Sequence, residues 1–152
     1  MCSGGWMRIT YKGDYAMKAV LQLAVSYNKG VVTIHDLAAR TKAPKKFLEQ
    51  ILLELKKGGF VESRRGKIGG YALTKSPASI RVGDVIQFVD GPIEPIPCVN
   101  EGYAECEDLQ TCLFRGIWKQ VAKATLDIVN NVTFDDLAKK IRSQEEVISY
   151  SI

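Results

Sequence analysis

The sequence predicts a mainly α-helical protein: a winged helix-turn-helix with a two-stranded wing, followed by a long C-terminal helix. Three observations predict it. Apolar residues recur at helical spacing in three segments before residue 60, a hairpin rich in arginine and glycine follows, and a second apolar stripe lies after residue 112. The 152 residues, 46% of them hydrophobic, suffice for one core. Because neither an apolar run of about 18 residues nor an export signal is present, we expect a cytoplasmic protein.

The first three helices have recognisable ends. We take Asp14 as the N-cap of the first helix, which should stop before Gly30. Thr33 caps a short second helix, and Pro44 suits the first turn of a third, which ends at a Gly-Gly pair. The inward faces carry apolar residues at helical spacing, namely Met17, Val20, Leu21, Ala24, Val25, Ile34, Leu37, Ala38, Leu48, Ile51, Leu52 and Leu55.

A tight join between the second and third helices is typical of a helix-turn-helix, whose second helix lies in the DNA major groove. FVESRRGKIGGYALTK then predicts two short strands, residues 60–63 and 71–74, around a basic tip, which is the wing. Basic side chains neutralise phosphates, glycines let backbone amides approach them, and Glu49 can accept a hydrogen bond from a cytosine amino group. The predicted DNA-contacting residues are Lys45, Lys46, Glu49, Gln50, Arg64, Arg65, Lys67, Gly69 and Gly70.

The distribution of charge supports a double-stranded DNA partner. Residues 1–75 contain 14 Lys or Arg against 5 Asp or Glu, a net charge of +9, whereas residues 76–152 carry a net −5. Such a division indicates that the front half meets a polyanion. The alternative is that these lysines only keep the surface soluble.

The back half is organised differently. SPASIRVGDVIQFVDG predicts a helix that ends at Gly91, and TFDDLAKKI predicts a short last helix capped by Thr133. Between them a long helix carries an apolar stripe that we expect to pair with a second copy of the chain; the alternative is packing on its own domain. The stripe consists of Phe114, Ile117, Trp118, Val121, Ala122, Thr125, Leu126 and Val129. The predicted division is 7–91 for the DNA-binding domain, 92–112 for a cysteine loop, 113–141 for the dimerisation and terminal helices, and 142–152 for a loose tail.

The cysteine loop, PCVNEGYAECEDLQTC, contains Cys98, Cys106 and Cys112, separated by seven and five residues. Soft thiolates select zinc, copper(I) or iron-sulfur clusters, and a reducing cytosol disfavours disulfides. The gaps are longer than those of a zinc knuckle, which favours a larger inorganic core. We therefore predict an iron-sulfur cluster, 2Fe-2S or 4Fe-4S, and leave a zinc site or a thiol-only redox switch as alternatives. Cys2 is far from the loop in sequence, and we assign it no role.

The block from Val32 to Gly91, above all RRGKIGGYAL, and the three spaced cysteines resemble the Rrf-type winged-helix bacterial transcription regulators. The resemblance covers about residues 7–140. It implies a homodimer joined through the long helix, with the three cysteines as iron ligands in the cluster-bearing members. IscR-like members complete the ligand set with a histidine three residues after the last cysteine, where this chain has Arg115.

Arginine cannot ligate iron, and the one histidine, His35, reads as an ordinary helix residue. NsrR-like members use an acidic residue early in the first helix, reaching across from the partner subunit, and that position matches Asp14. Carboxylates within the loop could also donate an oxygen: Glu101, Glu105, Glu107 and Asp108.

The sequence thus predicts a homodimeric DNA-binding regulator, repressor or activator, whose operator affinity follows the status of its cluster, nitric oxide or redox conditions. A zinc-stabilised protein-interaction module and a cluster-free thiol regulator are the alternatives. An enzyme is not expected, because no Ser-His-Asp set, phosphate-binding glycine loop or pair of catalytic carboxylates is apparent.

Overall fold

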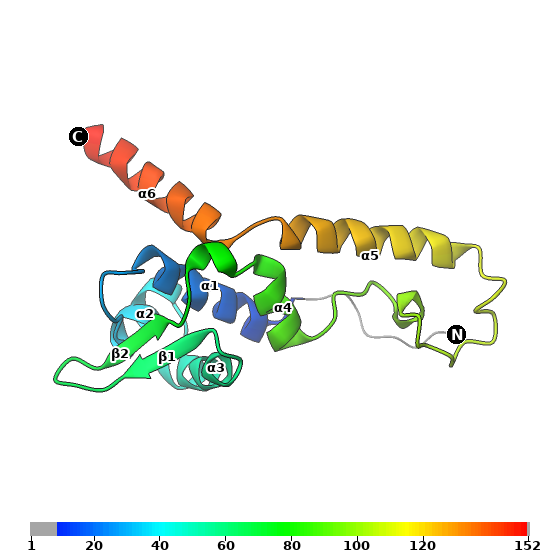
Figure 1. Cartoon of the computed structure of the whole chain (residues 1–152), viewed down its shortest axis with the longest axis horizontal. Helices are drawn as coiled ribbons and strands as arrows, with labels where there is room; N and C mark the ends of the chain where they lie inside the picture. The colour runs from blue at the N-terminus through cyan, green and yellow to red at the C-terminus, as the bar shows by residue number, and fades with distance from the viewer. Residues whose placement is uncertain (1–8, 152) are drawn as a thin grey trace.

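The computed structural model describes residues 9–151, so Cys2 and the predicted start of the first domain at residue 7 lie outside the described residues. Figure 1 shows the first three helices and the wing gathered at one end, with α5 and the loop before it extending to the other side. The helices of the first group are α1 (Tyr11–Val25), α2 (Ile34–Thr41) and α3 (Lys45–Lys57). Their predicted apolar faces meet in one core, whose members from α2 and α3 are almost fully buried: Leu37, Leu48, Ile51, Leu52 and Leu55.

The start of α1 corrects one prediction. Its N-cap is Thr10, whose hydroxyl accepts a hydrogen bond from the Gly13 amide at 3.0 Å, and Asp14 lies in the first turn instead. Thr10 is itself held by Asp90, at the end of α4, which accepts from the Thr10 amide at 3.0 Å and from its hydroxyl at 2.5 Å. A Cβ at Gly13 would overlap the Asp90 carboxylate, so any larger residue there would have to displace this side chain. The end of α4 is therefore locked to the beginning of α1.

The predicted wing is present, with strands shifted by about one residue. Strands β1 (Val61–Arg64) and β2 (Gly70–Leu73) form an antiparallel pair with Val61 opposite Leu73 and Arg64 opposite Gly70. An isolated bridge between Val32 and Tyr71, with two 2.9 Å hydrogen bonds, docks the wing on the segment before α2. The Thr33 cap of α2 is confirmed, because its hydroxyl accepts from the Asp36 amide.

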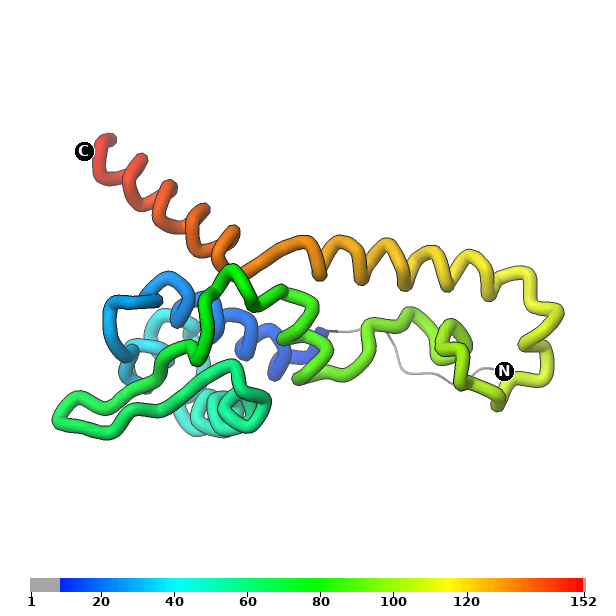
Figure 2. Tube along the Cα trace, in the orientation of Figure 1, coloured from blue at the N-terminus to red at the C-terminus, as the bar shows by residue number. Residues whose placement is uncertain are grey.

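The second half begins with a single 3-10 turn, η1 (Pro77–Ser79), and the predicted helix α4 (Val82–Asp90), which packs Val82, Val85 and Val89 on the core. The chain then leaves the domain as the cysteine loop, which contains another 3-10 turn, η2 (Pro97–Val99), and returns as α5 (Phe114–Asn130). The tube in Figure 2 follows this excursion from green to yellow and back along α5. The cysteine loop therefore connects the end of α4 to the start of α5.

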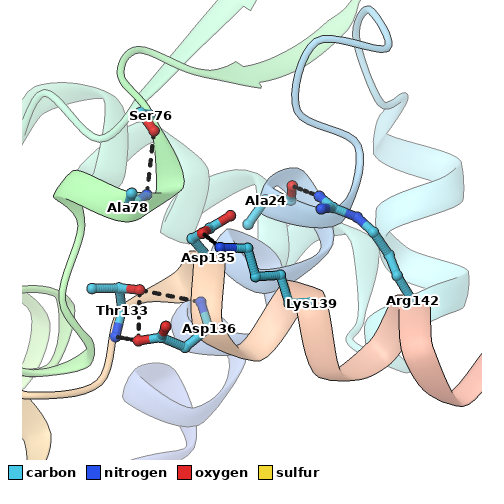
Figure 3. A network of polar contacts seen from close by, with 8 residues as sticks. All are labelled: Ala24, Ser76, Ala78, Thr133, Asp135, Asp136, Lys139 and Arg142. Carbon is cyan, nitrogen blue, oxygen red and sulfur yellow. Dashed lines mark hydrogen bonds and ion pairs between the residues drawn. The ribbon is translucent and has the colours of Figure 1, made fainter.

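The last helix is longer than the sequence indicated. Thr133 and Asp136 form the predicted N-terminal cap as a reciprocal capping box (Figure 3), but α6 (Phe134–Tyr150) runs through the segment predicted to be a loose tail. Arg142 fixes the middle of α6 by donating to the Ala24 carbonyl oxygen of α1 at 3.3 Å. Because residues 142–152 contain neither glycine nor proline, no local signal stops the helix.

Helix α5 buries its apolar stripe unevenly within the chain. Phe114, Ile117 and Trp118, near the cysteine loop, are 65%, 52% and 38% exposed. The other five residues of the stripe are buried or half-buried, namely Val121, Ala122, Thr125, Leu126 and Val129. The second half of the stripe therefore packs on its own domain, and only the first half is left open. No helix within residues 9–151 is both long and apolar enough to cross a membrane.

Candidate functional site

The third helix presents its predicted DNA-contacting residues on one exposed face. Its buried residues fix the orientation of α3, so that Lys45, Lys46, Glu49 and Gln50 face solvent in the first half of the helix. His35, assigned no role from sequence, is also exposed, with Nε2 3.5 Å from the Lys45 ammonium. The surface of the helix-turn-helix is thus open to a large polyanion.

The wing presents Arg64, Arg65 and Lys67 at its exposed tip. Arg64 is not free, because its Nε and Nη2 both donate to Glu62 Oε1 at 2.8 Å. This pair was not predicted from the sequence. Because side chains two residues apart on a strand point to the same face, the predicted strand could have indicated that Glu62 and Arg64 lie side by side.

The two wing glycines have different surroundings. A Cβ at Gly70 would lie 2.6 Å from the Val32 carbonyl oxygen, so the docking of β2 already requires glycine there. At Gly69 the nearest atom would be the Arg64 carbonyl oxygen at 3.2 Å, a tight contact but a less severe one. Gly70 therefore has a structural explanation that does not involve DNA.

All three loop cysteines face one pocket. Turns fold the loop back on itself, with the Tyr103 amide donating to the Asn100 carbonyl oxygen at 3.2 Å and the Cys112 amide to that of Asp108 at 2.8 Å. Cys98 is buried and the other two thiols are half-buried, and all three are free of disulfides. The pocket has a volume of about 430 Å³, and its lining is completed by Ile96, Leu109, Phe114, Arg115 and Trp118.

Arg115 is the charged member of this lining. Its Nε donates to the Cys98 carbonyl oxygen at 2.8 Å, which ties the first cysteine to the first turn of α5. The position that would hold a histidine ligand in the IscR-like branch is thus occupied here by a side chain that holds the loop.

The donor set suits soft metals, since three thiols stand on an otherwise largely apolar wall. In the part of the chain that the structure describes, however, no three His, Cys, Asp or Glu side chains are grouped closely enough to hold a single metal ion. A structural zinc ion holds its thiolate ligands about 2.3 Å from one centre, whereas an iron-sulfur cluster distributes its thiolate ligands over two or four irons.

Asp14 lies outside the cysteine pocket of its own chain. It lines a separate surface hollow with Ile9, Tyr11 and Met17, and its carboxylate pairs with the Lys18 ammonium at 2.6 Å. This hydrogen bond raises the pKa of the exposed Lys18 amine above its ordinary value. The loop carboxylates are also exposed and outside the pocket lining: Glu101, Glu105, Glu107 and Asp108.

Known proteins resemble this chain over most of its length. The family model Rrf2, described as an iron-dependent transcriptional regulator, matches residues 9–140. An rrf2-like HTH-type transcriptional regulator of Rhodobacter capsulatus is 38% identical over 136 residues, which cover 85% of this chain and 91% of that protein. The HTH-type transcriptional regulator IscR of Klebsiella pneumoniae is 34% identical over 145 residues, 95% of this chain and 85% of that protein.

Solved structures agree with the sequence comparisons. The global cysteine regulator CymR of B. subtilis has a TM-score of 0.74 at 29% identity, covering 88% of this chain and 97% of that one. IscR of T. potens has a TM-score of 0.71 at 28% identity, covering 88% of both chains. The winged-helix fold predicted from sequence is confirmed. The chain therefore belongs to the Rrf2 family and is a DNA-binding transcriptional regulator, not an enzyme.

Proposed function

We propose that this protein is a cytoplasmic, homodimeric regulator whose operator affinity is controlled by an iron-sulfur cluster held by Cys98, Cys106 and Cys112. The observation that carries the proposal is that these three thiols, spread over 15 residues of sequence, line one pocket. A pocket with a largely apolar wall suits a cluster, whose potential and stability depend on solvent exposure and on hydrogen bonds to its sulfurs. Bound there, a cluster would supply iron that oxygen or nitric oxide can attack.

The DNA-binding surface combines α3 with the wing. Lys45, Lys46 and Gln50 stand at the exposed start of α3, where a recognition helix meets phosphates and base edges. Glu49 on the same face is assigned to a cytosine amino group, which makes it a selectivity residue. Arg65, Lys67 and Gly69 at the wing tip are assigned to the DNA backbone or minor groove, and so is Arg64 once it leaves Glu62.

The second subunit is proposed to cover the exposed first half of the α5 stripe and the residue before it. Leu113, just before α5, and Phe114 and Ile117 within it are 89%, 65% and 52% exposed, an apolar concentration unusual for a monomer surface. A twofold axis through α5 would place two recognition helices on successive half-sites of an operator.

The fourth ligand is proposed to be Asp14 of the second subunit. Within one chain Asp14 pairs with Lys18 and is not among the residues that line the cysteine pocket, so the proposal assigns the ligand role to the second copy. An oxygen ligand binds a soft iron centre less firmly than a thiolate, which would make that iron the site of attack. A loop carboxylate is the alternative donor.

The link from loop to DNA runs through α4. The loop begins directly after Asp90, whose carboxylate holds Thr10 at the start of α1, and α1 packs on α2 and α3. A change in the loop can therefore reach the recognition helix through packed elements, provided that a cluster binds the two arrangements differently.

A cluster-free thiol regulator is the second candidate. It is favoured by the likeness to CymR, a cysteine regulator, and by the absence within the described residues of a ready-made group for one metal ion. The two are separated by selecting operators from a duplex library under anaerobic conditions and comparing iron-loaded, iron-free and oxidised protein. The proposal requires that iron loading change operator affinity, whereas the thiol regulator requires that only oxidation change it.

A further inference from the structure

We infer that Glu62 is a built-in competitor of DNA phosphate for Arg64, and that it weakens the sequence-independent affinity of the wing. The inference rests on the proposed contact between Arg64 and DNA. Its basis is the geometry of the pair, in which Nε and Nη2 of Arg64 both reach Glu62 Oε1 at 2.8 Å. A guanidinium that donates two hydrogen bonds to one carboxylate is held in a defined direction.

The strand itself positions this pair. Glu62 and Arg64 are two residues apart on β1, so their side chains share one face of the wing. Their cross-strand neighbours are Ala72 and Gly70, which offer neither side chain another charged partner. The pairing is thus a local property of β1 and not part of a larger ionic network.

The other wing cations differ from Arg64. Among the ion pairs of residues 9–151, none involves Arg65 or Lys67. Arg65 and Lys67 can therefore bind phosphate directly, whereas Arg64 must first release the Glu62 carboxylate. After that exchange the Glu62 carboxylate remains close to the DNA and is repelled by it.

The expected effect is modest, because both side chains are partly solvated, with 42% and 57% of their area exposed. Exposed ion pairs of this kind change an equilibrium by about two- to fivefold. An effect of this size lowers binding to arbitrary DNA without abolishing it.

The test compares Glu62→Gln with Glu54→Gln. Glu54 is an equally exposed glutamate of α3 that pairs with Lys12 at 2.7 Å, so both variants gain the same formal charge and lose one surface ion pair. Binding to a mixed-sequence 30-base-pair duplex is measured by fluorescence anisotropy across a range of salt concentrations. We expect each wing of E62Q to bind DNA about two- to fivefold more tightly than a wild-type wing, with a gain that shrinks as added salt screens the Glu62 charge, and we expect E54Q to change much less.

Equal gains for both variants would mean that only overall charge matters and would overturn the inference, as would no gain for E62Q. Arg64→Gln separates this from a failure of the proposed DNA contact. If R64Q binds like the wild type, Arg64 does not contact DNA and both statements fall. If R64Q weakens binding but E62Q does not strengthen it beyond E54Q, only the inference falls.

Discussion

The guanidinium of Arg115 donates from Nε to the backbone carbonyl oxygen of Cys98 at 2.8 Å, across 17 residues of sequence. The bond closes the cysteine loop by joining the first ligand candidate to the first turn of α5. Arg115 stands where the resemblance to IscR-like members would place a histidine ligand. In this chain its role is structural, because it holds the cysteine loop against α5.

Arg115→Ala should loosen the loop even without metal. Losing a hydrogen bond from a charged donor costs about 1.5 kcal/mol or more, so amide exchange across residues 98–112 should accelerate about tenfold in metal-free protein. Hydrogen exchange followed by mass spectrometry measures this. Arg142→Ala is the matched control, because Arg142 also donates to a backbone carbonyl, at Ala24, but lies on α6. Equal protection of the loop in wild type and R115A would refute the holding role.

Gly70→Ala should destabilise the fold more than Gly69→Ala. The new Cβ at residue 70 would meet the Val32 carbonyl oxygen at 2.6 Å, whereas at residue 69 the closest contact is 3.2 Å. Overpacking against backbone costs about 1–3 kcal/mol in the free energy of unfolding, measurable by urea denaturation. If G70A is as stable as the wild type but binds DNA poorly, Gly70 belongs to the DNA contact instead.

Ile117→Glu should separate the subunits. Ile117 is 52% exposed within one chain, and burying a carboxylate at the centre of the proposed interface should raise the dimer dissociation constant about 30-fold or more. Sedimentation equilibrium measures it. Gln120→Glu adds the same charge off the apolar stripe and should leave the dimer intact. A dimer that survives I117E would place the interface elsewhere.

Asp14→Asn should make a bound cluster less durable. Once the carboxylate ligand is gone, visible absorbance should disappear about tenfold faster in air than from wild-type protein. Lys18→Met provides the control, because it removes the 2.6 Å ion pair but keeps the carboxylate. Equally fast loss in D14N and K18M would assign Asp14 to the local ion pair, and unchanged durability in D14N would direct the search to the loop carboxylates.

Much of the fold could be predicted because its signals are local. The 3.6-residue periodicity located the helices, and the hydroxyls of Thr33 and Thr133 marked two helix starts correctly. The cap of α1 was predicted wrongly, because Thr10 and Asp14 are both good capping residues and the deciding partner, Asp90, is 80 residues away. The extent of α6 was missed because its second half, where Val147 and Ile148 are exposed, does not continue the apolar face that packs Phe134 on the core.

The site was only partly predictable, because contacts between residues distant in sequence hold it together. Residue type and spacing identified the three cysteines as candidate ligands. Their common pocket depends on backbone turns that the sequence does not mark clearly. The ties that hold this region, Arg115 to Cys98 and Asp90 to Thr10, join residues distant in sequence. Long-range hydrogen bonds of this kind become visible only in three dimensions.

Iron and acid-labile sulfide analysis of anaerobically isolated protein, with its visible absorption spectrum, tests the central claim most directly. The account predicts about two or about four irons with matching sulfide per chain, and loss of both when Cys98, Cys106 and Cys112 are replaced by alanine. Protein that is free of iron and sulfide, or that retains zinc in their place, would contradict it.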